Sequence, residues 1–205
     1  KNNYEVQIIC IYRSENFNPN LSKKINVTFL NKDKIFQSIF KIRKILSKLE
    51  SSFIISFITA TNIALSIAKL FLKKKHFYLL TQHEIPSLNL AKSRYFYFIF
   101  LIKIFYPLAD AIICVSKGLE LELKELLRNK QNNKIYTIYN FVEKNFKFKR
   151  NRSMPYKLLS VGRLVKVKDF KTLIKAIYIL KNEIEIKLTI IGNGPEKNNL
   201  NNLIW

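Results

Sequence analysis

The residues best placed to do chemistry lie in residues 158–169, LLSVGRLVKVKD. An apolar, strand-like run leads into Gly162 and Arg163, and Lys168 and Asp169 stand where the next helix should begin, with Asp169 as its cap. Ligands of open α/β sheets bind at the carboxyl ends of strands, and helix N-termini attract phosphate. Arg163 and Lys168 could therefore bind a diphosphate. A solvated basic loop is the alternative, and spacing alone does not separate the two.

A second loop of this kind, residues 192–196 (GNGPE), follows the buried, strand-like run 186–191. Gly192 and Gly194 would let the backbone approach a ligand closely, although the same sequence also forms an ordinary tight turn. The chain has four glycines, and none of them precedes Gly118. The first part of the chain therefore has no glycine-rich phosphate loop of its own.

His83 is the candidate in the first part of the chain, because it follows the strand-like run 77–81 and should lie on the rim of the same sheet. A packed or merely solvated histidine is the alternative. His76 and His83 do not form a metal cluster with Cys10 and Cys114 at any familiar spacing, and no metal site is expected. Both cysteines lie in apolar runs and are expected to be free, buried thiols.

Strand-like and helix-like apolar runs alternate along the chain, which predicts parallel sheets with crossover helices. The expected strands of the first region are 4–11, 53–57, 77–81, 111–115 and 135–139, and the expected helices are 35–49, 62–72, 93–105 and 117–128. The alternation restarts with strands 157–161 and 186–191 and helices 170–180 and 195–204.

These patterns predict an N-terminal Rossmann-like domain over residues 1–143, with helices on both faces of its sheet, a basic linker over 144–155, and the start of a second Rossmann-like domain over 156–205. We expect the first domain to lack its initial strand and the second to be cut short, because two or three parallel strands seldom form a stable domain.

The formal charge is +22, and it is spread over both halves of the chain. Such a charge favours anionic partners, but a Lys- and Asn-rich composition typical of an AT-rich genome explains it equally well. Residues 51–68 are uncharged but contain Ser, Thr and Asn, so we expect a strand followed by a helix. Residues 94–109 are very apolar but short, and Lys103 interrupts them, so a buried or surface-lying helix is expected there.

Five segments in order resemble the large retaining glycosyltransferase family 4 (group 1), which has the two-domain GT-B fold. They are T-x-H at Thr81 and His83, A-D-x-I-I-x-V-S at 109–116, I-x-N-x-V-E at 138–143, V-G-R-L-x-x-x-K-D at 161–169 and I-I-G-x-G-P-E at 190–196. The resemblance covers almost the whole chain.

By this resemblance, Arg163 and Lys168, next to Gly162, would hold the diphosphate of a UDP- or GDP-sugar. His83 would lie near the transferred sugar, and Gly192 and Gly194 would line the nucleotide side of the cleft. The reaction would transfer a sugar, with retention, to a hydroxyl of a sugar or lipid-linked acceptor in cell-surface polysaccharide or glycolipid synthesis. No metal or other cofactor is expected, and no Asp-x-Asp pair occurs in the sequence.

The sequence departs from the family at both ends, where the first strand with its glycine-rich loop and the later Glu-x7-Glu pair are not found. Three alternatives therefore stay open: an inactive truncated protein of the same fold, a sugar-nucleotide epimerase of this fold, and a basic nucleic-acid-binding protein, although no nucleic-acid motif is present and no nucleic-acid partner is expected. The expected location is the cytoplasm, with helix 94–106 as a candidate contact with the inner face of an anionic membrane.

Overall fold

The computed structural model describes residues 4–12, 25–32, 34–70, 72–73, 75–84, 94–128, 132–142 and 154–203. The chain divides into two compact units, Lys1–Val142 and Glu143–Trp205, which are treated separately below. The expected linker, residues 144–155, lies outside the described residues except for its last two positions.

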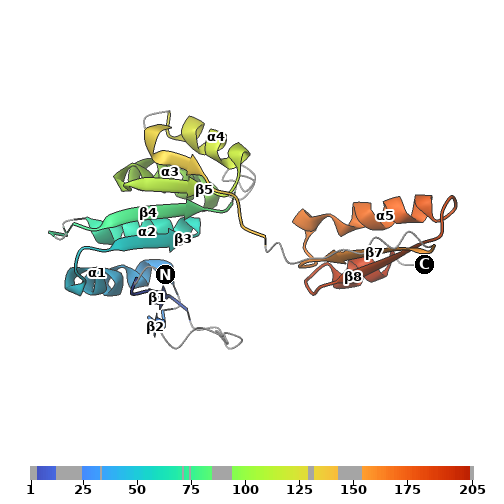
Figure 1. Ribbon diagram of the computed structural model, residues 1–205, viewed down its shortest axis with the longest axis horizontal. Helices are drawn as coiled ribbons and strands as arrows, with labels where there is room; N and C mark the ends of the chain where they lie inside the picture. The colour runs from blue at the N-terminus through green and yellow to red at the C-terminus, as the bar shows by residue number, and fades with distance from the viewer. Residues whose placement is uncertain are drawn as a thin grey trace. The chain divides into compact units, whose positions relative to one another are not determined.

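All strands of the first unit pair in parallel, as the alternating pattern predicts. They form a two-stranded sheet of β1 (Gln7–Cys10) and β2 (Asn26–Phe29) and a four-stranded sheet in the order β3 (Phe53–Phe57), β4 (Phe77–Gln82), β5 (Ala111–Cys114) and β6 (Ile135–Thr137) (Figure 1). We expected one sheet, and β2 was not expected at all. Residues 25–29, INVTF, do alternate apolar and polar side chains, so the signal for this strand was present in the sequence.

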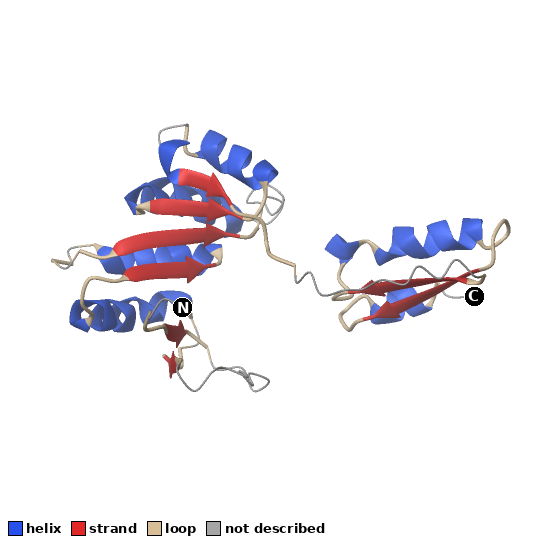
Figure 2. Ribbon diagram, in the orientation of Figure 1, coloured by secondary structure: helices blue, strands red, loops and turns tan. Residues whose placement is uncertain are grey.

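Helices connect these strands. The longer ones are α1 (Ile39–Lys48), α2 (Thr59–Lys69), α3 (Arg94–Phe105) and α4 (Lys117–Leu126), and short 3-10 turns cover Ile35–Ser38, Tyr106–Leu108 and Asn132–Lys134. Figure 2 shows α2 and α3 behind the strands of the larger sheet. The core between helices and sheet is built from fully buried side chains such as Leu46, Ile63, Leu80, Ile112 and Leu123.

The other face of the larger sheet is exposed along its two edge strands, whereas Thr81 and Ala111 of the central strands are buried on it. Along β3, Phe53, Ile55 and Phe57 are exposed, whereas Ser56 on the opposite face is buried. Tyr136 of β6 repeats this pattern beside buried Ile135. We expected helices on both faces, and the described helices cover one.

The second unit contains β7 (Tyr156–Val161), a 3-10 turn at Lys166–Lys168, α5 (Phe170–Leu180), β8 (Ile186–Ile191) and α6 (Lys197–Asn201). The two strands pair in parallel along their whole length, from Tyr156 beside Ile186 to Val161 beside Ile191. Its small core is Leu164, Phe170 and Leu200, with partly buried neighbours such as Leu173 and Ile190.

Both candidate membrane stretches form ordinary secondary structure. Residues 51–68 contain strand β3 and most of helix α2, as expected. Helix α3 has 12 residues, and at about 1.5 Å per residue it is far shorter than the roughly 30 Å of a bilayer core. Among the described residues, no helix has the length and hydropathy of a membrane span.

Candidate functional site

The candidate site of the first unit is the rim of the larger sheet at the carboxyl ends of β3 to β6. Because these strands are parallel, the residues that follow them meet at one edge. Phe57 closes β3, His83 follows β4 and Ser116 follows β5. The rim is therefore where a ligand of this unit would bind.

His83 is exposed and lies at this rim, where the sequence analysis expected it. Its Nε2 lies 3.1 Å from the hydroxyl oxygen of Thr81. Its ring also contacts the ring of Phe57, with centroids 6.0 Å apart and planes tilted by 40°. Thr81 and Phe57 thus contact the imidazole from two adjacent strands.

A buried hydrogen-bond network lies behind His83. Asn62 of α2 is at its centre, where it accepts a hydrogen bond from the Ser56 hydroxyl (2.5 Å) and donates to the Thr81 carbonyl (2.9 Å) and the Tyr106 hydroxyl (3.0 Å). Tyr106 in turn donates to Oε1 of Gln82 (2.5 Å). Burial raises the pKa of Tyr106, so its hydroxyl keeps its proton and remains a donor.

Gln82 ties this network to the loop after β4. Its Nε2 donates to the Thr59 hydroxyl (2.9 Å) and to the carbonyl of Glu84 (2.8 Å). The side chains of Asn62 and Gln82 are both fully buried, and every amide hydrogen and oxygen of the two has a partner. The backbone on both sides of His83 is therefore fixed.

The turn between β3 and α2 holds its backbone under strain. Ile58 has φ 74° and ψ 140°, a region that β-branched residues rarely enter, and it stands at the start of α2 without a side-chain cap. Such conformations cost on the order of 1–3 kcal/mol and occur where the surrounding structure fixes them. Here the turn leads directly into Thr59 and Asn62, the two α2 residues of the network.

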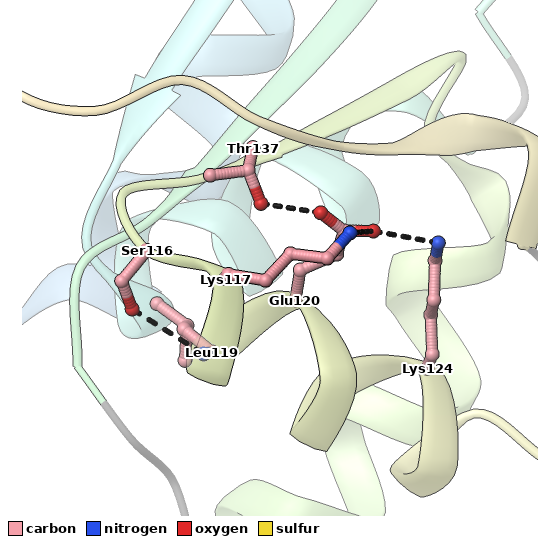
Figure 3. Close-up of polar contacts among 6 residues, drawn as sticks. All are labelled: Ser116, Lys117, Leu119, Glu120, Lys124 and Thr137. Atoms are coloured by element: carbon pink, nitrogen blue, oxygen red, sulfur yellow. Dashed lines mark hydrogen bonds and ion pairs between the residues drawn. The ribbon is translucent and has the colours of Figure 1, made fainter.

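A charged cluster occupies the β5 and β6 side of the rim (Figure 3). Ser116 caps α4 by accepting a hydrogen bond from the Leu119 amide (3.3 Å), as its position in the sequence predicts. Buried Glu120 binds Lys117 (2.8 Å) and Lys124 (2.7 Å) and accepts a hydrogen bond from Thr137. Hydrogen bonds from the two lysines and the threonine lower the pKa of Glu120 to about 2, against the opposing effect of burial.

The cysteines are free, as expected, and Cys114 is buried next to this cluster. Burial, together with the charge of Glu120, raises the pKa of the Cys114 thiol to about 12. The thiol is therefore protonated and unreactive at neutral pH.

The candidate site of the second unit is the pair of loops that follow β7 and β8. Arg163 and Lys168 are both exposed on the loop after β7. Within the described residues, neither side chain has a hydrogen-bond or ion-pair partner. Asp169 caps α5 as predicted, since its carboxylate accepts a hydrogen bond from the Thr172 amide (3.3 Å). Both cations are thus free to meet an anion.

Backbone hydrogen bonds join the two loops. The amides of Gly162 and Leu164 donate to the carbonyls of Ile191 (3.0 Å) and Asn193 (2.9 Å), and the Glu196 amide donates to the Leu164 carbonyl (3.0 Å). A Cβ on Gly192 would lie 1.9 Å from the Gly162 oxygen, and one on Gly194 would lie 2.4 Å from the Leu164 oxygen.

Both glycines are therefore required by the contact between the loops. From the sequence, either a bound ligand or an ordinary tight turn could explain these glycines, and the contact between the loops is a reason that needs no ligand. Gly162 itself is less constrained, because its nearest neighbour would be the Phe170 ring at 3.4 Å.

The sequence analysis missed the buried network. Its signal is the placement of uncharged polar residues inside otherwise apolar runs, as with Ser56 in FIISF and Thr81 and Gln82 at the end of FYLLTQ. Such residues need hydrogen-bond partners when buried. Which partners they find depends on the fold.

Comparison with protein families gives matches over the whole chain. Residues 1–146 match the family described as Glycosyltransferase Family 4, and residues 141–205 match the family described as Glycosyl transferases group 1.

Two curated relatives and one solved structure illustrate the similarity. The N-acetyl-alpha-D-glucosaminyl L-malate synthase of Bacillus anthracis is 31% identical over 98 residues, which are 43% of this chain and 25% of the relative. The N-acetylgalactosamine-N,N'-diacetylbacillosaminyl-diphospho-undecaprenol 4-alpha-N-acetylgalactosaminyltransferase of Campylobacter jejuni subsp. jejuni is 38% identical over 111 residues, 51% of this chain and 29% of the relative.

The structure of Anabaena Alr3699/HepE in complex with UDP and glucose has a TM-score of 0.65 at 15% identity and covers 88% of this chain and 52% of that protein. This likeness confirms the expected fold class, Rossmann-like α/β units of the GT-B type. The chain spans between a quarter and about half of the length of these proteins.

Proposed function

The chain belongs to the glycosyltransferases of the family described as Glycosyltransferase Family 4, and from this premise we propose that it serves the transfer of a sugar from a nucleotide diphosphate to a hydroxyl acceptor, with retention of configuration. The observation that carries the proposal is the pair of unpartnered, exposed cations Arg163 and Lys168 on a loop anchored at the carboxyl end of β7. The UDP and glucose bound to the Anabaena protein support a nucleotide sugar as donor.

The chemistry requires stabilisation of a departing diphosphate. Negative charge develops on the phosphate oxygens as the bond to the sugar breaks, and cations already in position stabilise it. Arg163 and Lys168 supply two positive charges on a loop whose backbone is held by the loop after β8. His83, fixed by the network behind it, is the proposed contact of the transferred sugar.

Binding of donors to this chain tests the site. We expect UDP-, GDP- or ADP-sugars, titrated calorimetrically, to bind with a clear preference for one nucleotide. Arg163→Ala and Lys168→Ala should each weaken binding about 10- to 100-fold, the worth of one charge-assisted hydrogen bond of roughly 1.5–3 kcal/mol. Lys175→Ala is the matched control, because Lys175 is an exposed lysine inside α5, away from the loop. Equal affinities in all three variants would refute the assignment.

For the acceptor, we propose a sugar or lipid-linked hydroxyl at a membrane surface, with the protein in the cytoplasm. The name of the Campylobacter relative includes a diphospho-undecaprenol, a lipid-linked substrate, which supports this class. Helix α3 offers the contact, because Phe96, Phe100 and Ile104, spaced four residues apart, are 71%, 60% and 45% exposed. Exposed Lys103 lies in the same helix, while Ile102 is buried in the core.

Helix α3 is therefore exposed on one side, which fits a surface-lying helix better than one buried on both sides. An apolar stripe with a lysine suits the interface of an anionic bilayer. We expect co-sedimentation with anionic vesicles, weakened about tenfold by Phe100→Ser, since burying one phenylalanine contributes roughly 1.5–3 kcal/mol. Phe40→Ser is the control, because Phe40 is 82% exposed on α1. Sedimentation that is insensitive to anionic lipid would count against membrane docking.

A further inference from the structure

We propose that Thr81 is a positioning residue that holds the neutral His83 ring as the Nε2–H tautomer, so that Nδ1 is the nitrogen presented to the ligand. The assignment follows from counting hydrogens. The Thr81 hydroxyl has a single hydrogen, and it donates this hydrogen to the Ser56 carbonyl at 2.8 Å. The same oxygen lies 3.1 Å from His83 Nε2 and must therefore accept, which makes Nε2 the donor.

Thr81 can set the tautomer of His83 because its own hydroxyl is held in one orientation. Thr81 is 6% exposed, and a hydroxyl turned toward the histidine would give up its hydrogen bond to the buried Ser56 carbonyl. Its own carbonyl accepts from Asn62 at 2.9 Å, which fixes the backbone of the strand at this residue. The orientation of the hydroxyl is therefore set by the core and not by the histidine.

The position of the ring follows from the same network. Gln82 holds the Glu84 carbonyl at 2.8 Å, so the backbone is tied down both before and after His83. The Phe57 ring lies beside the imidazole at 6.0 Å. In the described residues nothing bonds to Nδ1.

A neutral imidazole held in this way presents a hydrogen-bond acceptor. An acceptor suits a hydroxyl group of a sugar and not a carboxylate or phosphate, which would require a donor. That the ligand group is a sugar hydroxyl rests on the proposed function, whereas the tautomer does not.

The chain is well suited to a direct measurement, because it contains only two histidines, His76 and His83. With ring-15N histidine, long-range 1H–15N spectra at a pH where both rings are neutral report which nitrogen carries hydrogen. His76 is an internal reference for intact folding, because it is buried and its Nε2 lies 3.0 Å from the Leu46 carbonyl. His83→Gln assigns the signals.

We expect His83 in the wild-type chain to carry its hydrogen on Nε2, with a ring N–H protected from exchange. In Thr81→Val this exchange should accelerate about five- to tenfold, the effect of losing one hydrogen bond, while the His76 signals stay in place. Thr81→Ser keeps the hydroxyl and should restore protection. Hydrogen on Nδ1 in the wild-type chain would overturn the proposal even if no variant folded, and so would unchanged exchange in a folded Thr81→Val.

Addition of UDP-glucose to the same sample separates this inference from the proposed function. A shift of the His83 Nδ1 signal supports its use as the ligand contact. If UDP-glucose binds nowhere on the chain, the proposed function fails, while the tautomer stands on the ligand-free spectrum.

Discussion

The rim behind His83 and the loops after β7 and β8 fix their backbones by opposite means. In the first unit, side chains fix the backbone: Asn62, Gln82 and Tyr106 use all their side-chain donors inside the protein, while His83 is exposed. In the second unit, backbone groups bind one another directly, so the side chains of Arg163 and Lys168 remain unused. A site can thus be preorganised in two ways. Buried polar side chains can hold the backbone, or glycines can let backbone groups bind one another directly.

The largest expected effect is on stability, and it tests the backbone contact between the loops of the second unit. Gly192→Ala would place a Cβ 1.9 Å from a backbone oxygen, so the two loops must separate. We expect a loss of about 3 kcal/mol in the free energy of unfolding of the second unit, at the upper end for overpacking. Chemical denaturation measures it.

Gly118→Ala is the matched control for this change. Nothing lies within 4 Å of its added Cβ, and it stands in helix α4. Alanine should therefore stabilise the chain by up to about 1 kcal/mol. If both substitutions changed the free energy of unfolding in the same direction and by the same amount, the contact between the loops would not be the reason why Gly192 is required.

A smaller effect tests the side-chain mechanism. Tyr106→Phe removes a hydroxyl that donates to Gln82 and accepts from Asn62, and it leaves both amides short of a partner in the core. We expect a loss of about 2 kcal/mol in unfolding free energy. Tyr139→Phe, at a residue that is 67% exposed, should change it by less than about 0.5 kcal/mol. Equal stability of the two variants would show that the network does not hold the rim.

The smallest effect depends on pH and belongs to the first unit alone. The pKa of Glu120 is about 2 in the folded chain, against an ordinary value of 4.5. Between these values the folded state binds fewer protons than the unfolded state, so falling pH favours unfolding.

Glu120→Gln removes this dependence. The free energy of unfolding of the wild-type chain should exceed that of the variant by about 1 kcal/mol above pH ~5. This difference should vanish toward pH ~2. Unfolding curves across this range measure it. A difference that does not depend on pH would contradict a stabilising role for the ionised carboxylate.

The sequence predicted the second unit better than the rim of the first. Strand β8 and helix α5 have the predicted bounds, and Asp169 caps α5 as expected, because these features depend on residues close together in the chain. Two of the three partners of Asn62 are 19 and 44 residues away, and no local pattern contains them. Strand β2 was not predicted, although residues 25–29, INVTF, alternate apolar and polar side chains.

Glycine shows a second limit of the sequence. The motif at residues 192–196 identified a place of close backbone approach, and that was right. What approaches is the neighbouring loop, and a sequence cannot distinguish a ligand from the protein itself at such a position. The roles of Arg163 and Lys168 as ligand contacts stay predictions.

The three backbone hydrogen bonds between the loops also govern how the second unit moves. The Gly162 amide donates to the last residue of β8, and the amides of Leu164 and Glu196 donate across the two loops, so we expect neither loop to move out while the other stays. Opening is then a single cooperative event, and amides joined in this way exchange their hydrogens together. We therefore expect Arg163 and the turn at Gly192 to share one timescale of motion, although they lie 29 positions apart in the chain.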